Sequence, residues 1–168
     1  MEGNKGAIAM GRVVMVAGVI LALWMSAGRW LFGTGGSLTW WYLPSIGLCY
    51  AAVSFWLMRR MSVTRSRGKR TGRATIVTLV GSWVCAVAFG FLVPDYVDGE
   101  LESILSYAAG SDFSGEMSIA LCNPAGIIAF TLLGASIVFA YADARDKIAP
   151  EDEQWEGEGQ MSPHPYTL

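Results

Sequence analysis

Four apolar runs dominate this sequence, and each is about as long as a bilayer is thick. They cover residues 13–32, 38–58, 74–94 and 118–142. A helix rises about 1.5 Å per residue, so roughly 20 apolar residues cross the ~30 Å hydrocarbon core of a membrane. Inside that core an α-helix satisfies its own backbone hydrogen bonds. The runs therefore predict an all-α fold, an integral membrane bundle of four transmembrane helices.

The composition favours the same interpretation. Of the 168 residues, 53% are hydrophobic and only 15% are charged, whereas soluble domains average roughly 25% charged residues. Too little chain remains outside the runs for a second domain of ordinary size. We expect one four-helix transmembrane domain over residues 1–147. Residues 148–168 are acidic and contain Pro, Gly and Ser, which predicts a disordered cytoplasmic tail.

The first run also has features of a signal peptide. Lys5 and Arg12 precede it, and small residues follow its apolar middle at 26–28. The apolar stretch continues beyond these small residues to Phe32, which favours an uncleaved first span over a cleaved leader.

Residues 59–73 (RRMSVTRSRGKRTGR) hold seven of the twelve Lys and Arg residues, between the second and third runs. Positive loops remain on the cytoplasmic side, so we expect a multi-pass protein of the cell membrane with both termini cytoplasmic. Arg29 alone among the basic residues then lies on the opposite side. Nucleic acid is not an expected partner, because the loop has no aromatic residue on which bases stack. The predicted contacts with anionic lipid headgroups are Arg59, Arg60, Arg65, Arg67, Lys69, Arg70 and Arg73.

Two runs carry small residues at four-residue spacing. Gly18 and Ala22 lie on one face of the first run, and Ser82, Ala86 and Gly90 lie on one face of the third. Small residues allow transmembrane helices to approach closely. These five positions are therefore the predicted helix-packing residues.

The segment 95–117 contains six acidic residues and no basic one. Asp98 is a plausible N-cap and Gly110 a plausible stop. The segment predicts a short extracytoplasmic amphipathic helix over residues 99–109. Its apolar side, at i, i+3, i+4 and i+7 spacing, consists of Leu101, Ile104, Leu105 and Ala108.

Residues 95–99 (DYVDG) resemble the first part of the DxxDG…AR motif of CDP-alcohol phosphatidyltransferases, whose aspartates hold metal ions. The resemblance covers these five residues. The Ala-Arg pair and a downstream DxxxD are missing from this sequence. We therefore interpret the segment as a solvated acidic loop.

Asn123, Pro124 and Ala125 resemble the NPA triplet of aquaporins, but this chain has one triplet and too few spans. Asn as N-cap with Pro at the first helical position predicts a helix start at Pro124. The alternative is a discontinuous helix that lines a binding cavity.

The chemistry of the runs bounds the function. The only histidine is His164, in the tail, and no Asp, Glu or Lys lies deep in a run. We therefore expect no enzyme, no cofactor and no metal site. The hypothesis is a small polytopic accessory or interaction subunit that binds a membrane-protein partner, or its own copies, through helix–helix contacts. The alternative is a small oligomeric transporter or pore whose fourth span lines the path, with Asn123 and Thr131 in a cavity.

Overall fold

The structure, a computed structural model, describes residues 2–97, 99–110 and 114–145, with side chains from residue 11 onward. Within this part of the chain, four helices are long and apolar enough to cross a membrane. They are Gly11–Phe32, Thr39–Ser66, Arg73–Leu92 and Gly115–Ala144. The predicted set of four apolar helices is confirmed. The predicted tail at 148–168 lies outside the described residues.

Short elements join or extend these helices. The two that follow the third long helix are strands, so the fold is mostly helical rather than purely so. In chain order the elements are α1 (Glu2–Ala27), the 3₁₀ helix η1 (Gly28–Phe32), α2 (Thr39–Tyr42), the π-helical η2 (Leu43–Gly47), α3 (Leu48–Ser66), α4 (Arg73–Leu92), β1 (Asp95–Val97), β2 (Glu100–Glu102), α5 (Ile104–Ala109) and α6 (Gly115–Ala144).

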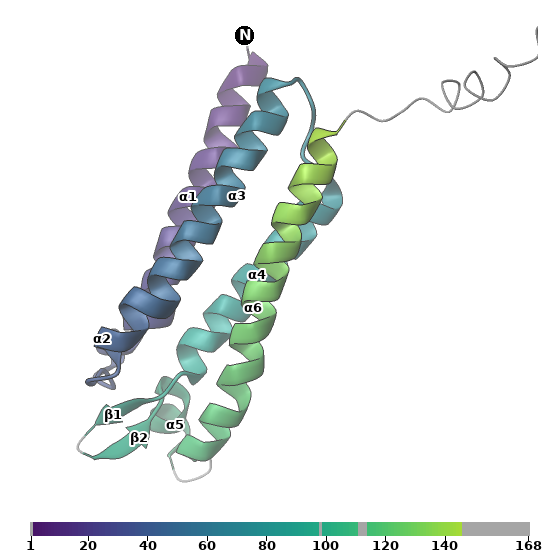
Figure 1. The fold of residues 1–168 in the computed structure, drawn as a ribbon. Coiled ribbons are helices and arrows are strands. Elements are labelled where there is room, and N and C mark those ends of the chain that lie inside the picture. Colours follow the sequence, from purple (N-terminus) through teal and green to yellow (C-terminus); the bar gives the residue numbers. More distant parts are fainter. Residues whose placement is uncertain (1, 98, 111–113, 146–168) are drawn as a thin grey trace, which may run out of the picture.

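The long helices form two antiparallel pairs (Figure 1). α1 packs on α3 and α4 packs on α6, while α3 also contacts α6 and α1 contacts α4. The loop between α3 and α4 lies at the same end of the bundle as the N-terminus. We call this the basic end. The β1–β2 ribbon and α5 lie at the opposite end, which we call the hairpin end.

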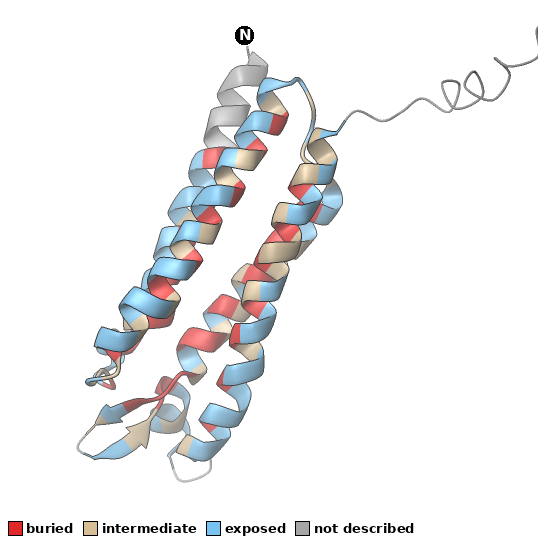
Figure 2. Cartoon of the chain, in the orientation of Figure 1, coloured by how far each residue is buried: buried red, intermediate tan, exposed pale blue. Residues whose placement is uncertain are grey.

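Burial divides each helix into two sides (Figure 2). Side chains such as Met25, Leu57 and Leu133 are fully enclosed between the helices. The outer sides are also apolar: Val84 and Ile127 leave 63% and 67% of their surface exposed. A bundle that is apolar both inside and outside differs from a water-soluble one, which places polar residues on the outer side.

A polar chain crosses the middle of the bundle. The Ser82 hydroxyl donates to the carbonyl of Ala129 at 2.7 Å and lies 2.8 Å from the Tyr50 hydroxyl. Because Ser82 has a single proton, Tyr50 is the donor in the second bond. This chain links α3, α4 and α6 through buried groups, all of which are satisfied.

The five predicted helix-packing residues are all buried. A Cβ on Gly18 would lie 2.5 Å from the Cβ of Ser54 on α3. A Cβ on Gly90 would collide with the indole of Trp24, whose Nε1 donates to the carbonyl of Val87 at 3.0 Å. These small residues therefore lie at contacts within the chain itself.

The predicted amphipathic helix over 99–109 is wrong in its first half. Residues 100–102 form a strand, in which Leu101 pairs with Tyr96. The helix begins at Ile104 because Ser103 and Ser106 form a reciprocal capping box there. The stop at Gly110 is confirmed. Asp98, the expected N-cap, lies outside the described residues.

The predicted helix start at Pro124 is also wrong. α6 runs without interruption from Gly115, and its N-cap is Ser114, whose hydroxyl accepts from the N–H of Met117. The first turns are held by burial of Ser118, which hydrogen-bonds Ser103 at 2.7 Å. Proline removes one backbone hydrogen bond, and a helix packed on its neighbours tolerates that loss.

α3 also extends beyond the second apolar run, to Ser66, so half of the basic segment 59–73 is helical.

Candidate functional site

Arg29 and Asp95 form a fully buried ion pair at the hairpin end. The Arg29 Nε lies 3.5 Å from Asp95 Oδ2, and neither side chain is exposed. Arg29 belongs to η1, and Asp95 is the first residue of β1. The pair therefore joins the end of the first long helix to the ribbon that follows the third.

The remaining donors of Arg29 are directed at backbone oxygens and, at 3.5 Å, at the Thr39 hydroxyl oxygen. Its Nη1 donates to the carbonyl of Pro94 and its Nη2 to that of Ser26, both at 3.0 Å. Its guanidinium carbon lies 4.7 Å from the centre of the Tyr42 ring. The Nε has no hydrogen bond beyond its long contact with the carboxylate. Arg29 thus links the end of α1, the residue before β1 and α2.

Asp95 accepts hydrogen bonds from Leu38, which precedes α2, and from Thr39, the first residue of α2. The N–H groups of Leu38 and Thr39 donate at 2.9 and 3.2 Å, and the Thr39 hydroxyl donates at 2.9 Å. Burial alone raises the pKa of the carboxyl, but hydrogen bonds from Gly36, Leu38, Thr39 and Tyr96 outweigh burial and hold the pKa below its ordinary value. The group therefore stays ionised.

This geometry gives Asp95 a structural role. Its oxygens face Arg29 and backbone N–H groups, whereas an aspartate of the phosphatidyltransferase motif must turn them to a metal ion. Within the described part of the chain, no three His, Cys, Asp or Glu residues gather as metal ligands. The pairing of Arg29 with Asp95 was not predicted from the sequence. The one available signal was an isolated arginine at the end of an apolar run, which needs a counter-ion.

At the basic end, hydrogen bonds tie the α3–α4 loop to the end of α6. Asp143 accepts from the N–H of Gly72 and from the hydroxyl of Thr75, both at 2.7 Å. Lys69 donates to the carbonyl of Ala144 at 3.1 Å. The loop is therefore held in place on α6.

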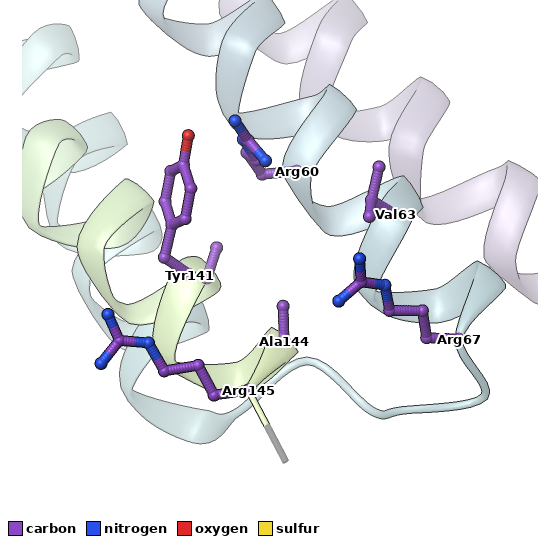
Figure 3. A pocket seen from close by; sticks show the side chains of 7 residues that line it. Arg60, Val63, Arg67, Tyr141, Ala144 and Arg145 are labelled. Carbon is purple, nitrogen blue, oxygen red and sulfur yellow. The ribbon is translucent and has the colours of Figure 1, made fainter.

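A cavity of about 360 Å³ opens beside this loop, between α3 and α6 (Figure 3). The guanidinium carbon of Arg60 lies 4.0 Å from the centre of the Tyr141 ring. Arg67 extends from α3 toward the space, and Arg145 lies at the end of α6 beside Tyr141. We call this cavity the arginine pocket. Its described lining consists of Arg60, Val63, Arg67, Ala140, Tyr141, Ala144 and Arg145.

The structure divides the predicted lipid-contact residues. Arg60 and Arg67 line the arginine pocket, whereas Arg59 lies over the ring of Phe55, 5.8 Å from its centre. The remaining members of the set are distributed along the end of α3, the loop and the start of α4. They are Arg65, Lys69, Arg70 and Arg73. Arg145 joins the pocket from a distant part of the sequence.

The two residues predicted for a cavity, Asn123 and Thr131, are both exposed on α6. They therefore face away from the interior of a single bundle.

The chain matches no protein-family model, no curated protein and no solved structure.

Proposed function

We propose that this protein is a small polytopic membrane protein that acts as an accessory or interaction subunit and binds a partner membrane protein through α6. The observation that carries the proposal is the contrast between the two sides of the bundle. Inside the bundle, polar groups of Tyr50, Ser82 and Ala129 are already joined to one another by hydrogen bonds. The outer side of α6 instead presents a hydroxyl and an open glycine.

Apolar exposure along the helices supports placement in a bilayer, because water would make such surfaces costly. The concentration of Lys and Arg at one end supports orientation with that end in the cytoplasm. In this placement both chain termini are cytoplasmic, and the hairpin end faces the other side of the cell membrane.

The proposed contact surface, the outer α6 face, consists of Ile127, Thr131, Gly134 and Val138. These positions follow 4-3-4 spacing, which is the spacing of a helix–helix seam. Ile127 and Val138 are 67% and 66% exposed, and a Cβ on Gly134 would meet nothing within 4 Å. Glycine and threonine on a helix surface allow close approach and hydrogen bonding to a second transmembrane helix. The predicted small-residue faces are occupied inside the bundle, so this face is the one we assign to a partner.

The alternative is a small oligomeric transporter or pore. Its support is that Asn123 and Thr131 are both exposed on α6. These two side chains would line a path only between copies, since neither points into the bundle.

Photo-crosslinking in native membranes, followed by mass spectrometry and sizing in detergent, tests the proposal. A photoreactive amino acid at Ile127 or Val138 is expected to capture another membrane protein. The same label at Val84, which is equally exposed on α4, is the matched control. Gly134→Leu should abolish the complex while the isolated chain remains as stable as before. Capture of a second copy with solute flux would favour the pore. Equal labelling from α4 and α6 would contradict both proposals.

A further inference from the structure

We propose that the arginine pocket is a specific phosphate-binding site, for the phosphate of an anionic lipid headgroup or of a soluble phosphate compound. This inference is separate from the proposed partner surface. Only the lipid source depends on the proposed placement of the basic end at the membrane surface.

The charge balance of the pocket favours an anion. Its lining contains three positively charged residues, Arg60, Arg67 and Arg145, and none of the described lining residues is acidic. α3 and α6 both end here, and each helix end has about half a negative charge on its last carbonyls. The partial negative charges of the two helix ends do not cancel the full positive charges of the three arginines. Lys69 further offsets them, because it donates to the carbonyl of Ala144.

The arginines do more than complement the helix ends. Arg60 lies well before the last turn of α3, which ends at Ser66, and the dipole effect is confined to about one turn. Tyr141 supports the flat face of the Arg60 guanidinium at 4.0 Å. Stacking occupies the face and leaves the N–H groups at the edge of the plane pointing outward. Those groups match two oxygens of a phosphate in a forked pair of hydrogen bonds.

The pocket has the size of a ligand site. Its volume of about 360 Å³ lies within the roughly 300–1,000 Å³ usual for small-molecule pockets. Its lining comes from two helices, and the loop between α3 and α4 is held by Asp143 through Gly72 and Thr75. The cationic groups are therefore presented on supported elements, as a specific site requires.

The basic end of the bundle also supplies a matched control. Arg70 and Arg73 are exposed and basic, as are Arg67 and Arg145, but they do not line the pocket. Diffuse attraction to an anionic surface depends on the total number of Lys and Arg residues near it. Binding at a specific site depends instead on which arginines are removed. Two double variants with equal net charge therefore separate the two cases.

The experiment measures binding of phosphatidic acid to the purified full chain in neutral detergent by native mass spectrometry. Diacylglycerol, which lacks the phosphate, is the reference lipid. Wild-type protein should retain phosphatidic acid in preference to diacylglycerol. Arg67→Gln with Arg145→Gln should weaken retention at least tenfold, because the loss of even one charge-assisted contact has an effect of about that size. Arg70→Gln with Arg73→Gln should weaken it by less than about twofold.

Inorganic phosphate at millimolar concentration distinguishes the two sources. Displacement of the lipid assigns the site to soluble phosphate compounds, and persistence of the lipid assigns it to headgroups. Thermal unfolding of both double variants checks that they fold. The proposal is overturned if the two variants lose binding equally, or if wild-type protein retains diacylglycerol as well as phosphatidic acid. In either case the basic end is a diffuse charged surface.

Discussion

Arg29 and Asp95 are the residues whose environment departs most from that of an ordinary surface ion pair. Both are fully buried, and transfer of two charges out of water costs several kcal/mol per ion in proteins. The structure offsets this cost with hydrogen bonds from four residues to Asp95 and with carbonyl acceptors for Arg29. The pair and its hydrogen bonds therefore link η1, α2 and β1.

Removal of one member of this pair should be strongly destabilising. We expect Asp95→Asn to lower the unfolding free energy by roughly 3–5 kcal/mol, because Arg29 is left as an uncompensated buried charge. Chemical unfolding in detergent, followed by circular dichroism, measures this change. Glu100→Gln, at an exposed position of the same ribbon, is the matched control and should change stability by less than about 0.5 kcal/mol.

The pH dependence of stability separates charge from packing in this experiment. Because hydrogen bonds hold the folded-state pKa of Asp95 below its ordinary value, its contribution is complete above about pH 4. The contribution is lost as pH falls through the lower folded-state pKa. Wild-type stability should therefore fall more steeply below about pH 4 than that of Asp95→Asn. Parallel pH profiles would mean that the carboxylate charge does not stabilise the fold.

At the scale of elements, close helix contacts depend on single glycines. Gly90→Ala should lower stability by about 1–3 kcal/mol, because the new methyl group displaces Trp24 from its hydrogen bond to Val87. Gly134→Ala places the same methyl group in open space on α6. That variant should be neutral or gain up to about 1 kcal/mol from helix propensity. Thermal unfolding of both variants in detergent measures the difference. Equal stability would show that α1 and α4 are not tightly packed at Trp24.

The helices were predictable because their signal is a long apolar run, and a run of that length has few alternatives. The strands and the short helix at the hairpin end were not predictable in this way. Leu101 fits the helical spacing of Ile104 and Leu105, but three-residue strands are too short to show a period of their own. Asn123 and Pro124 have the sequence of a helix start, yet burial of earlier residues such as Ser118 extends α6 beyond them.

The arginine pocket and the buried ion pair were also only partly predictable from the sequence. A cluster of basic residues is visible in the sequence, so Arg60 and Arg67 were singled out for a charged surface. Their association with Tyr141 and Arg145 depends on how α3 and α6 pack, which the sequence does not state. The pairing of Arg29 with Asp95 likewise joins residues from two distant segments through a turn before α2.

At the scale of the whole molecule, the two ends differ in what they leave accessible. The hairpin end encloses its buried ion pair, because the Arg29 guanidinium and the Asp95 carboxylate have no exposed surface, and its exposed charges, such as Glu100, are acidic. The basic end keeps Arg67 and Arg145 exposed around a pocket. If the chain spans a bilayer as proposed, ligands with phosphate groups meet their binding groups on one side only. The orientation of the chain therefore decides which compartment the arginine pocket samples.

That orientation is open to a direct labelling experiment in intact cells, in a background with Ala in place of Cys49, Cys85 and Cys122. Ser37 and Ser66 are exposed, near the hairpin end and at the basic end respectively. Because positive loops stay in the cytoplasm, Ser37→Cys should react with a membrane-impermeant maleimide. Ser66→Cys should react only after the cells are permeabilised. The opposite labelling would place the arginine pocket outside the cell and overturn the orientation, while labelling of both positions in intact cells would contradict a bundle that spans the membrane.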